Sequence, residues 1–185
     1  MHVFIRPALA SDVDVIAGLI EAVHAELAPE RGGAVWLVSE ARALPLRPSI
    51  VVDIGAPDVH VSVSGIDDVV LGVAVTRIRN LHDATRVAFV SELVVDPQAR
   101  GVGLGVGLLD DAVVWAREMG AVGIESTALP GQRATKNFFE AAGMKARLLT
   151  VYASLVDDAL DDALDDELAG VGPASVHSDF EGVRG

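Results

Sequence analysis

The order of apolar and polar residues predicts alternating strands and helices along most of the chain. Apolar runs rich in β-branched residues predict strands over 2–6, 58–65, 69–79, 87–95, 122–129 and 148–155. Apolar residues that recur every three or four positions predict helices over 11–27, 34–44, 106–119 and 132–142. Ser11 or Asp12 is the expected N-cap of the first helix. Residues 49–54 have β propensity and are expected to form a strand or a turn.

Some of these patterns also predict how the strands are connected. Residues 66–68, Ile-Asp-Asp, separate two strand patterns and predict a hairpin. Residues 87–129 read strand, helix, strand, which predicts a β-α-β crossover between two parallel strands. Within 58–65, valines alternate with His60, Ser62 and Ser64. We expect His60 to face the solvent, because it stands in a polar row with no second ligand nearby.

The stretch 87–119 combines a strand, a glycine-rich loop and a helix. The strand runs into the turn Asp96-Pro97, and the loop from Arg100 to Gly105 reads RGVGLG. Glycines let an anion approach the backbone, and the N–H groups and dipole of a helix N-terminus favour negative charge. The stretch therefore predicts a phosphate-binding turn. The dinucleotide pattern G-x-G-x-x-G fails, because Val106 or Leu108 replaces its third glycine, and no P-loop Gly-Lys-Ser/Thr follows.

The loop reads Arg-x-x-Gly-x-Gly through Arg100, Gly103 and Gly105, after a strand that ends in Leu-Val-Val-Asp-Pro. This arrangement resembles the acetyl-coenzyme A signature of the GNAT superfamily of N-acetyltransferases. The opening Ile-Arg-Pro-Ala and the segment 138–144, Phe-Phe-Glu-Ala-Ala-Gly-Met, are also similar to the family pattern. The resemblance covers about 3–155. It implies an α+β (α/β) GNAT fold for residues 1–155, with a mixed, twisted sheet of about six to seven strands flanked by helices.

The resemblance also implies where acetyl-CoA would bind. The glycine loop would hold the pyrophosphate, and the strand before it would pair with the pantetheine. A backbone N–H near Val94 would donate to the thioester oxygen. Arg100 would either add a charged contact to phosphate or be a surface arginine. The implied cofactor-binding residues are Leu93, Val94, Val95, Arg100, Gly101, Val102, Gly103, Leu104, Gly105, Val106 and Phe139.

Acetyl transfer to an amine requires that a proton leave the attacking ammonium. Glu92 lies on the same strand face as Val94, at a position where relatives often carry an acid, and is the candidate base. It would act directly or through a water; the alternative is a structural or amine-positioning carboxylate. Phe139 stands where many relatives carry a tyrosine general acid, so solvent would have to protonate the thiolate. Weaker polar candidates are Ser91, Ser126 and Thr127.

In the family, the first helical hairpin lines the acceptor side of the cleft. Candidates for substrate contact on this hairpin are Glu21, His24, Glu26, Glu30 and Trp36. The alternative is a solvated helix face for the acids and a core or lid position for the tryptophan. Peptide N-termini, lysines, polyamines, aminoglycosides and small metabolites all stay open as acceptors.

Composition narrows the function classes. The formal net charge of -13 argues against nucleic-acid binding and favours amine substrates. The absence of cysteine excludes disulfides, thiolate metal sites and a cysteine nucleophile, and we expect no metal site. No apolar run approaches the length of a bilayer span, and the first residues lack a signal-peptide pattern. We therefore expect a soluble, cytoplasmic protein with no membrane partner.

Residues 156–185 are predicted to be an acidic helical tail with a loose end. Leu160, Leu164 and Leu168 stand four apart, which predicts one apolar stripe on an otherwise acidic helix. This helix would lie on its own domain, form a homodimer contact, or guard the cleft with negative charge.

Taken together, the residues and the resemblance predict an acetyl-CoA-dependent N-acetyltransferase. It would transfer an acetyl group to the primary amine of a small molecule or peptide by direct attack on the thioester. The alternative is a non-catalytic coenzyme A-binding or regulatory module, which Phe139 and the leucine-striped tail motivate. An interaction protein that keeps only the fold is disfavoured by the intact RGVGLG loop.

Overall fold

The computed structural model of the chain describes residues 2–155. Residues 2–150 belong to one compact unit, and residues 151–155 belong to a second. The strands are β1 (Val3–Pro7), β2 (Val59–Ile66), β3 (Val69–Asn80), β4 (Arg86–Val95) and β5 (Ile124–Ser126). The helices are α1 (Val13–Leu27), α2 (Gly33–Ser39), α3 (Leu46–Gly55), α4 (Leu104–Glu118) and α5 (Arg133–Ala141). Short 3₁₀ turns η1 (Ala10–Asp12) and η2 (Pro97–Ala99) precede α1 and the glycine loop.

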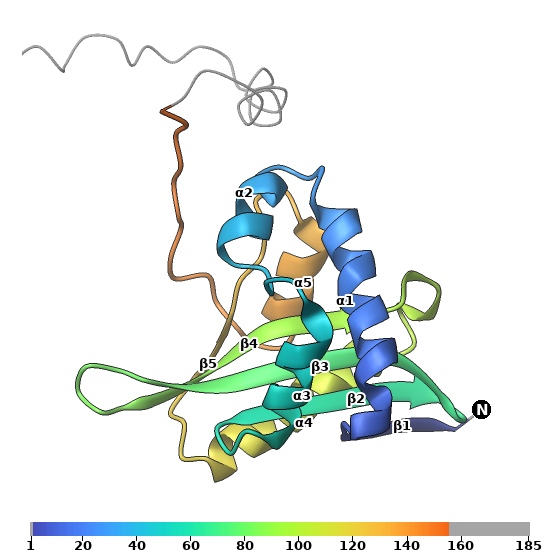
Figure 1. Cartoon of the computed structure of the whole chain (residues 1–185). Coiled ribbons are helices and arrows are strands. Elements are labelled where there is room, and N and C mark those ends of the chain that lie inside the picture. Colours follow the sequence, from blue (N-terminus) through green and yellow to red (C-terminus); the bar gives the residue numbers. More distant parts are fainter. Residues whose placement is uncertain (1, 156–185) are drawn as a thin grey trace, which may run out of the picture. The chain divides into compact units, whose positions relative to one another are not determined.

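The strands form one mixed sheet in the order β1-β2-β3-β4-β5 (Figure 1). From β1 to β4 each strand pairs antiparallel with the next one in the sequence, and β5 pairs parallel with β4. The predicted hairpin and β-α-β crossover are therefore confirmed. The described residues contain five strands, so the expectation of six to seven is wrong for this part of the chain.

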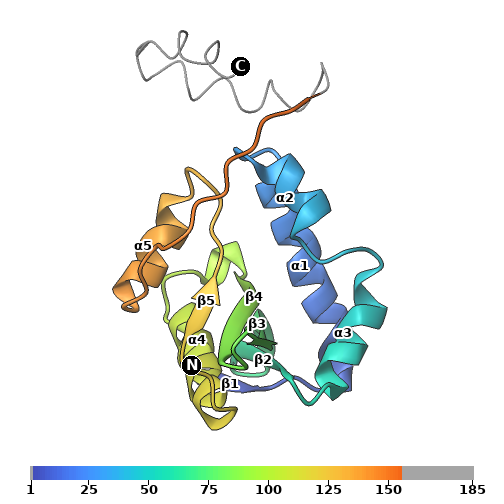
Figure 2. The same ribbon diagram turned by 90° about the vertical axis from the view of Figure 1, so that its left-hand side faces the viewer.

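Helices cover both faces of the sheet, and each face has its own apolar core (Figure 2). α1 and α3 pack on one face, where Ile16, Ile20 and Ile50 are buried against Val63 and Val75. α4 and α5 pack on the other face. Their side chains meet β4 and β5 in a smaller cluster formed by Val90, Leu93, Leu109, Ala112, Ile124, Phe138, Phe139 and Met144.

α4 approaches the sheet closely because the strand residues beneath it are small. A Cβ added to Gly72 would lie 2.6 Å from Ser64 Oγ and 3.2 Å from Leu108 Cδ1. His60 lies on this same face and does not face the solvent as predicted. Its Nε2 lies 2.7 Å from Asp111 Oδ2, and its ring stacks on Trp115. The alternating pattern correctly separated the two faces of β2, but a helix covers the polar row.

Residues 49–54 form part of helix α3, so the predicted strand or turn is wrong. Leu46, Ile50 and Asp53 are buried at the spacing of one helix face. The intervening Val51 and Val52 are exposed. Contact of that face with α1 and β2 outweighs the β propensity of the branched side chains.

Two further boundaries differ from the sequence prediction. Helix α2 ends at Ser39, not at residue 44, and the following chain carries Arg42 into the interior. Residues 148–155 form no strand, and Leu148 and Leu149 are exposed. β5 is only three residues long and covers less than the predicted 122–129. The predicted acidic helix lies outside the described residues, and the boundary at 155/156 stays a prediction.

Candidate active site

Strand β4 contains a β-bulge at the place where the site residues lie. Thr76 pairs with Val90 and Val75 pairs with Glu92, so Ser91 is the extra residue. Val90 belongs to the core beneath α4, whereas Glu92 and Ser91 both line a pocket on the opposite face. The bulge thus turns two consecutive polar side chains to the same side of the sheet, as bulges near functional sites often do.

Beyond the bulge, β4 leaves its parallel neighbour. Pairing with β5 ends at Val90 and Ser126, so the last residues of β4 have no strand on that side. The N–H of Asp96 donates to Leu71 O on β3. Because backbone groups alternate along a strand, those of Leu93 and Val95 point toward the open edge. These residues flank Val94, near which the resemblance implied a free backbone donor.

The glycine loop follows β4 and ends at the N-terminus of α4. Asp96 caps η2 by accepting from the Gln98 N–H at 2.8 Å. Gly101 and Gly103 have φ values of 86° and 93°, in the left-handed region that favours glycine. A Cβ built on either would meet no atom within 4 Å, so the space in front of the loop is open.

Helix α4 begins at Leu104, with Gly103 as its N-cap. The first helical hydrogen bond joins the Gly107 N–H to Gly103 O, so the N–H groups of residues 104–106 have no partner within the helix. Gly105 lies against the end of β4: its Cβ would be 3.6 Å from Val95 Cγ2 and from Phe138 Cε2. Val102 and Val106 are exposed. The predicted loop residues therefore lie together at the open edge of β4.

Arg100 connects this loop to helix α1. Its Nη1 and Nη2 donate to the two carboxylate oxygens of Glu26 at 2.9 and 2.6 Å, and its Nε donates to Val95 O at 3.2 Å. The hydrogen bonds to Glu26 raise the pKa of Arg100 and lower that of Glu26. The structure thus brings one predicted acceptor-side residue next to one predicted phosphate-side residue.

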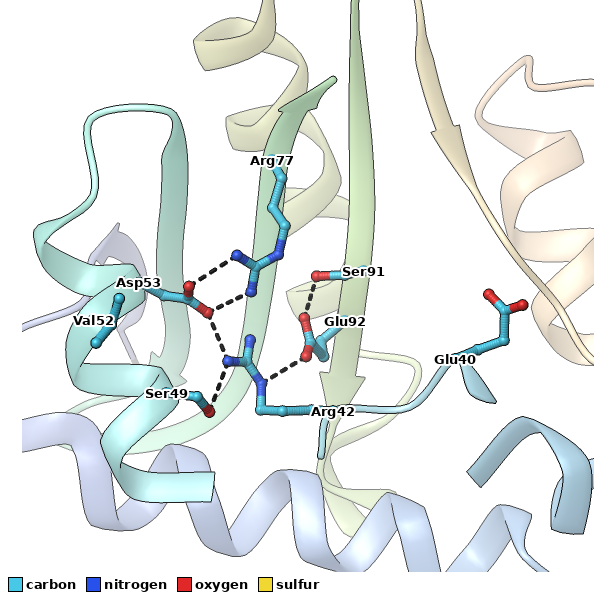
Figure 3. Close-up of a pocket in the computed structure, with 8 residues that line it drawn as sticks. All are labelled: Glu40, Arg42, Ser49, Val52, Asp53, Arg77, Ser91 and Glu92. Atoms are coloured by element: carbon cyan, nitrogen blue, oxygen red, sulfur yellow. Dashed lines mark hydrogen bonds and ion pairs between the residues drawn. The ribbon is translucent and has the colours of Figure 1, made fainter. Parts of the chain in front are cut away.

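Glu92 lies in a cluster of four charged side chains on the opposite side of the sheet from α4 (Figure 3). Arg42 Nε donates to Glu92 Oε1 at 2.7 Å, and Arg42 Nη1 donates to Asp53 Oδ2 at 2.6 Å. Arg77 donates to both oxygens of Asp53. The other oxygen of Glu92 accepts from the Ser91 hydroxyl. The side chains of Arg42 and Glu92 are only 5% and 11% exposed.

Burial and pairing oppose each other in this cluster. Burial lowers the pKa of Arg42, but the charge of Glu92 and the bonds to Glu92 and Asp53 outweigh it, so the net shift is upward. Burial raises the pKa of Asp53, but the bonds from Arg77 and Arg42 outweigh it and lower the pKa overall. Arg42 and Asp53 are therefore both charged at neutral pH. One nitrogen, Arg42 Nη2, is buried without a hydrogen-bond partner among the described residues.

The cluster lines an open pocket of about 450 Å³, formed by Glu40, Arg42, Ser49, Val52, Asp53, Arg77, Ser91 and Glu92. Sequence reasoning found Glu92 and Ser91 but missed the partners Arg42, Asp53 and Arg77. One signal was present: Asp53 is a lone acid within an apolar run, and such an acid needs a buried partner. Nothing local points to the loop residue Arg42.

The other predicted residues lie around this region. His24 on α1 packs edge-on against Trp36, with ring centroids 5.6 Å apart. Burial lowers the pKa of His24, while the nearby charge of Glu92 opposes that shift. Ser126 donates its hydroxyl to Val90 O, where the two parallel strands separate. Glu21 and Glu30 are exposed.

Phe139 packs in the core cluster below α4, in contact with Phe138. Phe138, which the sequence analysis did not single out, is the aromatic residue that approaches Gly105. Within residues 2–155, no group of three His, Asp or Glu side chains is placed to hold a metal ion. The same residues contain no helix long and apolar enough to cross a membrane.

The family model described as the Acetyltransferase (GNAT) family matches residues 20–144, which include the bulge, the glycine loop and α5. The chain belongs to the GNAT acetyltransferase family. No curated protein matches the chain significantly.

Solved structures share the GNAT fold. A mutant protein from Bacillus halodurans is 20% identical, with a TM-score of 0.72, over 83% of this chain and 99% of that one. An acetyltransferase from Trypanosoma brucei is 19% identical, with a TM-score of 0.60, over 83% of this chain and 100% of that one. AAC(6')-Iy in complex with the bisubstrate analogue CoA-S-monomethyl-acetylneamine is 16% identical, with a TM-score of 0.65, over 83% of this chain and 98% of that one. A protein described as a transcriptional regulator from Bacillus halodurans is also similar, with a TM-score of 0.64.

Proposed function

We propose that this GNAT protein transfers an acetyl group from acetyl-CoA to a primary amine by direct attack. One observation carries the proposal. The open edge of β4, the glycine loop at the N-terminus of α4 and the carboxylate of Glu92 all follow within fifteen residues of one bulge.

The residues present fit a coenzyme A diphosphate. Gly101 and Gly103 leave open space where a side chain would block the approach of a phosphate. The N–H groups of residues 104–106 and the helix dipole supply donors and positive potential there. Leu93 and Val95 present further backbone groups along the open strand edge, suited to pair with an extended amide chain. Arg100 would contact phosphate only by changing its pairing with Glu26.

Acetyl-CoA supplies an activated thioester; the protein must then hold the amine and accept its proton. We assign this role to Glu92, acting through a water, because both its oxygens already accept hydrogen bonds from Arg42 and Ser91. The N–H groups of Leu93 and Val95, at the open edge of β4, would polarise the acetyl oxygen. Phe139 cannot donate a proton, so solvent would protonate the thiolate.

A non-catalytic coenzyme A-binding module is the second candidate, because Glu92 is engaged in a buried ion pair and Phe139 lacks a hydroxyl. Calorimetric titration with acetyl-CoA, followed by thiol-release assays over an amine panel, separates the two. The panel includes aminoglycosides, because two similar structures are of an aminoglycoside acetyltransferase, one of them with sisomicin bound. Binding with amine-dependent thiol release supports the enzyme; binding without release on any amine supports the module.

A further inference from the structure

The pocket beside Glu92 contains one donor with no partner. Arg42 uses Nε for Glu92 and Nη1 for Asp53 and Ser49, while Nη2 has no hydrogen-bond partner among the described residues. Its side chain is 95% buried, since it is 5% exposed. An unmet guanidinium donor in such a place costs free energy, and an oxygen acceptor would remove that cost. In Figure 3 the nitrogen of Arg42 that has no dashed line lies on the side of the guanidinium that faces Arg77.

The side chain of Arg77 has room to move at this corner of the pocket. Its guanidinium is held by Asp53, yet its side chain is 34% exposed and reaches the pocket from β3. A ligand oxygen that enters beside Arg77 therefore meets two guanidinium groups that share a single carboxylate, Asp53. Planar guanidinium groups suit a carboxylate well, because both its oxygens can accept.

Among anions, the charges of the lining favour one negative charge over two. Arg42 and Arg77 are balanced by Asp53 and Glu92, and Glu40 adds a third acid to the lining. A doubly charged phosphate would add two negative charges beside three carboxylates, whereas a carboxylate adds one. Nη2 has almost no exposed surface, so a ligand oxygen reaches it only if the partly exposed side chain of Arg77 moves aside, and only the end of a ligand fits there.

The position of this donor relative to Glu92 defines the acceptor. One carbon atom joins Nη2 to Nε, and Nε holds Glu92. An oxygen held by Nη2 would therefore lie close to the carboxylate of Glu92. A short ligand can then place its amine beside that carboxylate. Resting on the proposed function, we propose that the acceptor is a free α-amino acid, with its carboxylate bound by Arg42 and Arg77 and its amine beside Glu92.

The test compares alanine, alaninamide and ethylamine. Their amine-bearing carbon carries a carboxylate, a neutral amide and a hydrogen, respectively. Each is assayed with the parent, Arg77→Gln, Arg77→Lys and the control Arg79→Gln. The control removes the same charge from the same strand, where Arg79 lies over the Phe89 ring instead of in the pocket. Comparing parent with variant for each compound cancels differences in amine basicity.

Losing one charge-assisted contact predicts that Arg77→Gln lowers kcat/KM for alanine roughly ten- to a hundredfold, mostly through KM. Ethylamine and alaninamide have no carboxylate and should therefore lose much less than alanine. Arg77→Lys should recover part of the loss for alanine, and Arg79→Gln should match the parent. Equal losses for alanine and ethylamine, or a parent that prefers ethylamine, would overturn the amino-acid assignment while leaving acetyl transfer intact.

A binding measurement decides the inference even if turnover is absent. Alanine is titrated by calorimetry into each folded variant saturated with coenzyme A. Tighter binding of alanine than of ethylamine, lost in Arg77→Gln but not in Arg79→Gln, supports the site. Equal alanine affinity in parent and Arg77→Gln refutes it. Failure of the proposed function shows separately, as absence of acetylation of every amine in the panel.

Discussion

Gly103 and Gly120 stand at the two ends of α4 and provide a matched test of the glycine loop. Their φ values are 93° and 73°, and a Cβ on either would meet no atom within 4 Å. Alanine in this region costs about 1–2 kcal/mol of folding free energy. Gly103→Ala and Gly120→Ala should therefore lower the free energy of unfolding by similar amounts, as measured by urea denaturation.

Only Gly103 lies where the phosphates are proposed to bind. Its methyl group would keep a phosphate oxygen from at least one of the N–H groups that follow, and a hydrogen bond to a charged group contributes about 1.5–3 kcal/mol. Gly103→Ala should thus weaken acetyl-CoA binding roughly ten- to a hundredfold, while Gly120→Ala binds like the parent. Calorimetric titration of both variants, after circular dichroism confirms folding, measures the difference. Equal affinities would refute the placement of the diphosphate.

Four further substitutions test other parts of the molecule. Glu92→Gln should lower kcat roughly ten- to a thousandfold with little change in acetyl-CoA affinity; parental activity across the pH profile would remove its role. Phe139→Tyr should leave thiol release equal or modestly faster, and a collapse would show that the phenyl ring itself is needed. Asp12→Asn should lower the free energy of unfolding by about 1–3 kcal/mol, because its buried carboxylate accepts from the guanidinium of Arg6 and from the Leu9 N–H. The pKa of Asp12 lies below its ordinary 3.8, so this difference should persist above pH 3.8 and shrink as acid protonates the carboxylate. Gly72→Ala should lower the free energy of unfolding by roughly 1–3 kcal/mol, because its methyl would lie 2.6 Å from Ser64 Oγ. Urea denaturation measures this change.

The geometry of the glycine loop was predictable because its signals are local. Strand, turn, glycines and helix follow one another within 87–119, and each residue type carries its own dihedral or capping preference. The parallel pairing of β4 and β5 followed from the handed crossover between them. The position of Glu92 beside the open edge followed from the family resemblance; its role as a base is a proposal.

The charged cluster around Glu92 was less predictable because its contacts are distant in sequence. Arg42 and Glu92 are fifty residues apart, and their pairing depends on where α2 ends. Residues 49–54 were misread because β-branched side chains conceal a helix whose buried face appears only through Leu46, Ile50 and Asp53. The bulge that turns Ser91 and Glu92 to one side has no turn residue to mark it. Residues 148–155 satisfy a strand pattern but form no strand.

The central claim is that the acetyl group moves from the coenzyme to an amine on this protein. The most direct measurement uses acetyl-CoA labelled with carbon-13 in its acetyl group, with mass spectrometry of the amine panel after incubation. The account predicts the label in an amide of at least one amine, in an amount equal to the coenzyme A released. Bound acetyl-CoA whose thioester stays intact with every amine, or thiol release without any labelled amide, would contradict it.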